Sequence, residues 1–128
     1  MEAYEASAFY SLTEAVVRNG LENRVEIHRG DIVEALPALL AERPGLRVSL
    51  LHCDLDVHDE TLATLQTVWP RIVRGGIAVF DEYAVDNWGE SDAVDAFFAT
   101  LDNSPELQML PGSPTPTAYC VKGSPGAA

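Results

Sequence analysis

The stretch LLHCDLDVHDET, residues 50–61, decides how the rest of the chain is interpreted. Its apolar residues stop at Asp54, and acidic side chains follow at once. Burying even one carboxylate is strongly unfavourable unless a partner compensates for it. An acidic cluster directly after an apolar segment therefore indicates contact with water, a metal ion or a reacting group at the end of a buried strand.

The segments around this stretch predict a strand, a helix and a second strand. Residues 48–53 are apolar with little alternation, which is typical of a strand buried on both faces. The next helix is expected to begin with Asp59 as its N-cap and to be broken before the Gly75-Gly76 pair. Residues 77–80 form the second apolar strand. This order predicts a βαβ unit with parallel strands.

Apolar spacing and the Gly, Pro, Asp and Ser residues between the apolar runs predict the other elements. Helices are expected over residues 4–19, 32–40 and 91–101, with Ser91 as the N-cap of the last, and strands over residues 25–28, 107–110 and 117–121. The alternation of helix and strand predicts an α/β fold with a mostly parallel sheet and helices on both faces.

Length and composition are those of one globular domain. The chain has 128 residues, of which 47% are hydrophobic, and a formal net charge of −12. This charge argues against nucleic acid and anionic membrane surfaces as partners. The chain has no signal-peptide pattern and no apolar run approaching the roughly 20 residues of a membrane span, so a cytoplasmic protein is expected. Cys53 and Cys120 are expected to be buried free thiols.

Acidic residues end both strands of the predicted βαβ unit. Asp54 follows the first strand, and Asp81 and Glu82 follow the second. Neighbouring parallel strands lie about 4.8 Å apart and end at the same sheet edge, where α/β folds bind ligands. Three carboxylates with water suit a hard cation such as Mg²⁺. The pattern predicts a metal site, and the alternative is a set of solvated strand ends.

Three motifs together resemble the macrocin O-methyltransferase family. They are DLDVHDET, RIVRGGIAVFDEY and WGESDAVDAFF, and the resemblance covers roughly residues 8–122. It implies a class I, S-adenosylmethionine-dependent and Mg²⁺-dependent O-methyltransferase acting on a hydroxyl of a small natural product or sugar. The family's glycine-rich turn and ribose-binding acid are absent. The implied fold is therefore a partial Rossmann-like domain lacking its first two strands, over residues 1–122, with a disordered tail at residues 123–128.

The resemblance also implies roles for individual residues. The three acids at the strand ends would hold Mg²⁺, and Asp54 would be catalytic and also contact the cofactor. Gly30 and Asp31 would lie near the adenine of S-adenosylmethionine. His58 is either the general base or a surface residue at the start of a helix.

The missing strands leave an unpaired apolar edge along residues 48–53. Such an edge favours pairing with another chain, so a homo-oligomer formed through this edge is an expected partner arrangement. The chain alone is not expected to bind S-adenosylmethionine with useful affinity.

Three other interpretations remain open at this point. A haloacid-dehalogenase-like phosphatase would use Asp54 as nucleophile and Asp56 as acid/base, with Lys122, the only lysine, near the phosphate. A receiver-type signalling module fits the length and acidity but lacks the acid pair expected after its first strand. A non-catalytic remnant that pairs with a partner chain would share the methyltransferase fold.

Overall fold

The computed structural model describes residues 2–85 and 89–123. Most of the predicted elements are present, with bounds shifted by a few residues. In chain order they are α1 (Glu2–Arg18), α2 (Ile32–Glu42), β1 (Val48–Cys53), α3 (His58–Val68), the 3-10 helix η1 (Trp69–Arg71), β2 (Ile72–Phe80), α4 (Glu90–Phe98), β3 (Gln108–Met109) and β4 (Ala118–Val121).

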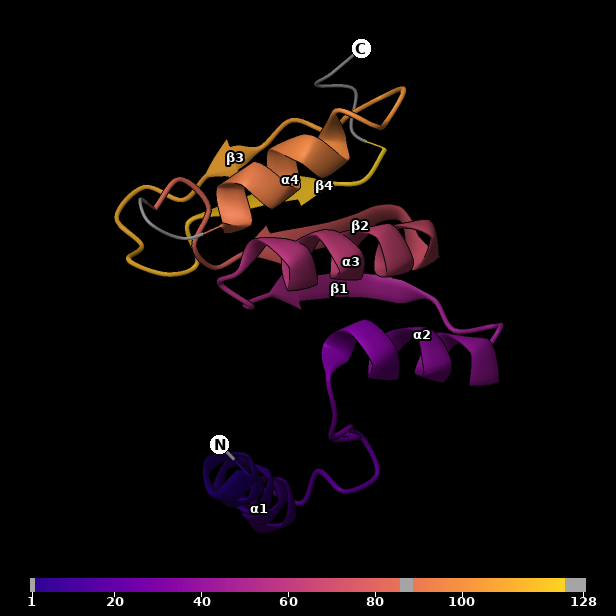
Figure 1. The fold of residues 1–128 in the computed structure, drawn as a ribbon, viewed down its shortest axis with the longest axis vertical. Coiled ribbons are helices and arrows are strands. Elements are labelled where there is room, and N and C mark those ends of the chain that lie inside the picture. Colours follow the sequence, from indigo (N-terminus) through magenta and orange to yellow (C-terminus); the bar gives the residue numbers. More distant parts are fainter. Residues whose placement is uncertain (1, 86–88, 124–128) are drawn as a thin grey trace.

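The four strands form one mixed sheet in the order β1-β2-β4-β3 (Figure 1). β1 and β2 are parallel and are joined through α3, which confirms the predicted βαβ unit. β4 runs antiparallel to both β2 and β3. The partial α/β fold is confirmed, with the parallel arrangement confined to the pair of strands that carries the acidic ends.

The core lies between the sheet and the helices α3 and α4, which pack side by side on one face (Figure 1). The rings of Trp69 and Phe97 have centroids 5.6 Å apart, and those of Phe80 and Phe98 are 6.2 Å apart. Edge-on and tilted contacts of this kind add to the stabilisation from apolar burial. The prediction that Trp69, Phe97 and Phe98 are core residues is confirmed.

The opposite face of the sheet is uncovered in the described part of the chain. Leu50 on β1 is 61% exposed and Ile77 on β2 is 36% exposed. α1 lies apart from the sheet, beyond α2 (Figure 1), and its Leu12 and Val17 are also exposed. Helices on both faces were expected, and within the described residues this expectation is wrong because no helix packs on the second face.

The strand predicted over residues 25–28 is also absent, although the structure describes this segment. A strand needs a neighbour for its backbone hydrogen bonds, and none lies beside these residues in the described sheet. The segment is instead attached to the end of α2. Arg43 Nη2 donates to Glu26 Oε2 at 2.6 Å, and His28 Nε2 lies 3.0 Å from the same oxygen.

β2 begins at Ile72, so the Gly75-Gly76 pair lies inside the strand and does not precede it. The register between β1 and β2 shifts next to this pair, between Val48 and Leu50. Gly75 has a φ of 84°, and a Cβ added to Gly76 would lie 2.8 Å from the carbonyl oxygen of Val73. The two glycines therefore accommodate an irregularity that other residues would not.

The connection from α2 to β1 is held by one arginine. Arg71 donates to the carbonyl oxygens of Leu40, Arg43, Pro44 and Leu46 at distances of 3.0 to 3.2 Å. These bonds join the last turn of α2 to the segment that follows it, and Leu40 is one of the last residues of the helix, whose carbonyls lack partners within the helix. Arg71 thereby fixes the start of β1 against the start of β2.

The caps of the two core helices differ from the predicted ones. α3 has Val57, not Asp59, as its N-cap, and α4 has Gly89, not Ser91. A Cβ on Gly89 would lie 2.7 Å from the backbone nitrogen of His58, so the start of α3 packs tightly against the start of α4. Ser91 Oγ instead accepts a hydrogen bond from the amide of Ala84 at 2.7 Å.

None of the described helices is both long and apolar enough to cross a membrane. Of the tail predicted to be disordered, residues 124–128 lie outside the described residues.

Candidate functional site

Asp54 and Asp81 meet at the carboxyl ends of β1 and β2, as the βαβ unit predicts. One ligand atom from each of them and one from His52 lie within 4.8 Å of one another. His52 Nε2 is 3.1 Å from Asp81 Oδ1. The parallel pairing of the two strands is what brings these three side chains together.

The sequence interpretation missed His52. A signal for it was present, because His52 interrupts the apolar strand two residues before Asp54, and residues two apart on a strand share a face. The two carboxylates are ligands that suit a divalent cation such as Mg²⁺ or Mn²⁺, whereas the imidazole of His52 is a ligand more typical of transition-metal ions. Glu82 is the next residue after Asp81 but is not part of this group, and its role as a ligand stays a prediction.

The acids disfavour one another's ionised forms. Desolvation, followed by the charges of Asp81 and Asp56, raises the pKa of Asp54, while His52 opposes this change. Desolvation and the charges of Asp81, Asp56 and Asp54 likewise raise the pKa of Glu82. A bound cation would relieve this repulsion, which is a physical reason to expect one here.

Two further carboxylates stand behind this group. Glu90 is fully buried at the start of α4, and its Oε2 accepts a hydrogen bond from the amide of Glu82 at 2.5 Å. Burial raises the pKa of Glu90 to about 7, and the charges of Asp81, Asp56 and Glu82 add to the rise, while the Glu82 amide lowers it. Asp56 has a φ of 63°, a strained conformation for a residue other than glycine.

Both of these carboxylates have a buried oxygen without a partner among the described residues. The atoms are Asp56 Oδ1 and Glu90 Oε1. No role for Glu90 was predicted from the sequence. An acid at the start of a helix usually interacts with the helix dipole, and only the packing shows that this one is buried.

His58 lies on the first turn of α3, with its side chain 44% exposed and Nδ1 2.9 Å from Asp59 Oδ1. This position agrees with a residue at the start of a helix. Its role as general base stays a prediction.

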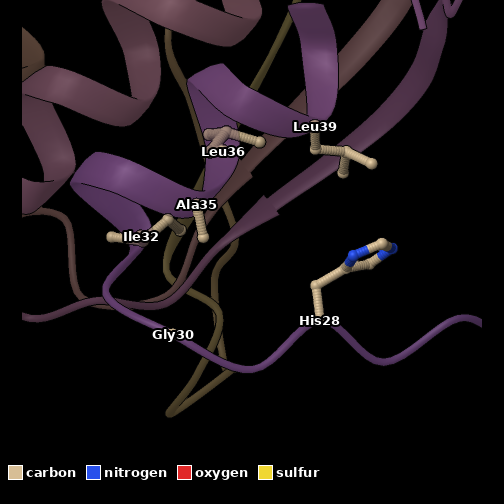
Figure 2. Close-up of a pocket in the computed structure, with 6 residues that line it drawn as sticks. All are labelled: His28, Gly30, Ile32, Ala35, Leu36 and Leu39. Atoms are coloured by element: carbon tan, nitrogen blue, oxygen red, sulfur yellow. The ribbon is translucent and has the colours of Figure 1, made fainter. Parts of the chain in front are cut away.

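Gly30 and Asp31 lie at the start of α2. The Oδ1 atom of Asp31 accepts a hydrogen bond from the amide of Val33 at 2.9 Å, so Asp31 is the N-cap of this helix. Gly30 lines a cavity of about 170 Å³ between α2 and the segment that precedes it. Figure 2 shows His28 extending from that segment below the apolar side chains of α2. The cavity is lined by His28, Gly30, Ile32, Ala35, Leu36 and Leu39.

A second cavity, of about 200 Å³, lies between α2, β1 and α3. It is lined by His52 and Asp54 on the side of the cation group and by Ile32 and Leu36 on the side of α2. Ile32 and Leu36 also line the first cavity, so the two hollows are neighbours. Gly30 lines the first cavity and Asp54 lines the second, whereas Asp31 lines neither.

Lys122 lies at the other end of β2. Its Nζ donates to the carbonyl oxygen of Trp69 in η1 at 2.7 Å and to that of Ile72, the first residue of β2, at 2.8 Å. Asp81 instead follows the last residue of that strand. The phosphatase interpretation needs this lysine near the phosphate beside Asp54. The structure places it at the opposite edge of the sheet.

The fold and the site place this chain among proteins of one family. Residues 2–83 match the family described as a methyltransferase domain, and the chain belongs to this family. The resemblance to O-methyltransferases is thereby confirmed.

Solved structures show which methyltransferases the chain is similar to. One is the apo structure of CalS11, a TDP-rhamnose 3′-O-methyltransferase of calicheamicin biosynthesis, with 36% identity, a TM-score of 0.67 and coverage of 75% of this chain and 41% of that chain. A second CalS11 structure matches equally well and is covered to 37%. The O-methyltransferase NovP, at 24% identity, supports the fold, with a TM-score of 0.64 and coverage of 87% of this chain and 45% of that one.

The chain spans less than half the length of each of these proteins. No curated protein matches it.

Proposed function

We propose that this chain carries the cation-binding part of an S-adenosylmethionine-dependent O-methyltransferase whose acceptor is a hydroxyl of a small natural product or sugar. The observation that carries the proposal is the meeting of His52, Asp54 and Asp81 at the carboxyl ends of two parallel strands, in a chain of the methyltransferase family. The similarity to CalS11, which methylates TDP-rhamnose, supports a sugar hydroxyl.

Each residue of the site would have its own role. His52, Asp54 and Asp81 hold a divalent cation, with Glu82 as a further oxygen ligand. When bound, such a cation lowers the pKa of a coordinated hydroxyl group and fixes its orientation. His58, exposed at the start of α3, would accept the proton from the acceptor.

Gly30, Asp31 and Asp54 would contact S-adenosylmethionine. The two neighbouring cavities along α2 support this assignment for Gly30 and Asp54, because Gly30 lines the first cavity and Asp54 lines the second. Each is smaller than the roughly 300 Å³ at which ordinary ligand pockets begin. We therefore expect this chain by itself to bind the cofactor weakly. Calorimetry with S-adenosylmethionine tests this point, and micromolar binding would refute it.

Calorimetric titration with Mg²⁺ tests the central proposal. The unaltered chain is expected to bind one ion, and the Asp54→Ala variant is expected to bind none. Absence of binding by the unaltered, folded chain, or full binding by Asp54→Ala, would rule out the cation site. Circular dichroism on the same samples establishes that both proteins are folded.

The free edge of β1 suggests how the domain is completed. β1 is an edge strand of the described sheet, and its Leu50 is largely exposed. We propose that a further strand pairs here, and that the isolated chain associates with a second copy through this edge. Light scattering after size exclusion should show association that weakens in Leu50→Lys. A concentration-independent monomer would contradict self-association.

A further inference from the structure

Glu90 is the buried carboxylate for which the proposed function has no role. It is the first residue of α4 and has no exposed surface. Its Oε2 receives the Glu82 amide, while its Oε1 has no hydrogen-bond partner in the described part of the chain. A buried carboxylate that is only half satisfied is unfavourable, and such a group calls for an explanation.

The groups around Glu90 are acidic. The charges that act on it come from Asp81 and Glu82 in the turn after β2 and from Asp56 in the loop after β1. Asp56 also has a buried, unpartnered oxygen, and the carbonyl oxygen of Asp56 accepts from the amide of Gly89 at 3.1 Å. Two carboxylate oxygens from separate segments are therefore unsatisfied, and their residues act electrostatically on the cation group, since the charge of Asp56 acts on Asp54 and that of Asp81 acts on Glu90. The two buried oxygens without hydrogen-bond partners, and not only the number of acidic residues, indicate that a positively charged group binds at this site.

We propose that Glu90 is a positioning residue of the cation site, which holds the Asp81–Glu82 turn through the Glu82 amide and adds a buried negative charge behind the ligands. This inference rests on the proposed cation site and deepens it. α4 thereby acts on the site in two places, because Ser91 Oγ accepts from the amide of Ala84 in the same turn. The turn that carries Asp81 is held by the helix that follows it.

The test uses Glu90→Gln, which separates charge from hydrogen bonding. A glutamine side-chain oxygen can still accept from the Glu82 amide, so the turn keeps its anchor while the charge is lost. Asp92→Asn is the matched control because Asp92 is an exposed acid on the first turn of the same helix. The readouts are the Mn²⁺ dissociation constant from calorimetry and the urea midpoint without cation.

We expect Glu90→Gln to raise the Mn²⁺ dissociation constant at least tenfold while its urea midpoint stays equal to or above that of the unaltered chain. Asp92→Asn should leave the dissociation constant within twofold. If the unaltered chain binds Mn²⁺ and Glu90→Gln binds it equally well, the role of Glu90 is refuted while the cation site stands. A lower urea midpoint for Glu90→Gln would show a merely structural residue and also refute the role. If the unaltered chain binds no Mn²⁺, the cation site itself fails.

Discussion

Replacing Asp54 by asparagine should change the stability of the chain in opposite directions with and without a cation. Ligand atoms of Asp54 and Asp81 lie within 4.8 Å of each other. Two like charges at that separation repel by about 0.9 kcal/mol in a water-like dielectric. The exposed position of Asp54 justifies the water-like value. Without a cation, Asp54→Asn should therefore be more stable by about 1 kcal/mol, or roughly 4 °C in melting temperature.

A bound cation reverses this order. Any ion that binds only the folded state at a hundredfold excess over its dissociation constant stabilises by about 2.7 kcal/mol. For a chain of this length that corresponds to a rise of about 10 °C in melting temperature. The unaltered chain should show this rise, and Asp54→Asn should show almost none because it has lost a ligand.

The assay is thermal unfolding followed by circular dichroism, with and without Mn²⁺ at fixed ionic strength. Asp102→Asn is the control, since Asp102 is an exposed aspartate after α4 and outside the cation group. It should keep the full response to Mn²⁺. The reasoning is refuted if Asp54→Asn retains the Mn²⁺ response, or if it melts below the unaltered chain when no cation is present.

Three further predictions concern the framework of the site. Gly89→Ala should lower stability by about 1–3 kcal/mol in urea unfolding, because its Cβ would lie 2.7 Å from a backbone nitrogen of α3; an unchanged midpoint would contradict this close contact. Arg71→Lys should lower stability by about 2 kcal/mol, because lysine cannot donate to all four carbonyls. Arg47→Lys, at an exposed position, should change stability by less than about 0.5 kcal/mol, and equal losses would show that Arg71 does not hold the connection from α2 to β1. Burial raises the pKa of Cys53 to about 12 and that of Cys120 to about 11, so both thiols stay protonated at pH 8. They should react with an aromatic disulfide only after the chain unfolds. Rapid labelling of the native chain would show that burial is incomplete.

Self-association through β1 and the role of Glu90 can be tested separately. Self-association is measured by light scattering and should weaken in Leu50→Lys. The role of Glu90 is measured by Mn²⁺ affinity and should be lost in Glu90→Gln. A result against one therefore leaves the other standing.

Some features of this protein follow from the sequence alone because they depend on local pattern. The strand β1 and the acid at its end are predictable from the apolar run, whereas the expected burial of both strand faces is wrong because Leu50 is 61% exposed. Two such strands joined by a helix are expected to be parallel, and this order alone predicts that Asp54 and Asp81 lie at one edge of the sheet. The three motifs carry the resemblance to O-methyltransferases that the family match confirms.

Other features were decided only by the tertiary structure. Residues 25–28 have the composition of a strand, but without a neighbouring strand they do not form one. His52 and Glu90 lie near acids that are distant in sequence because strand pairing and helix packing place them there. Local sequence can predict which segments are helices or strands, since that depends on nearby residues. Which charges share a site depends on contacts between segments 30 or more residues apart, such as Asp56 with Glu90, and only the folded chain provides those contacts.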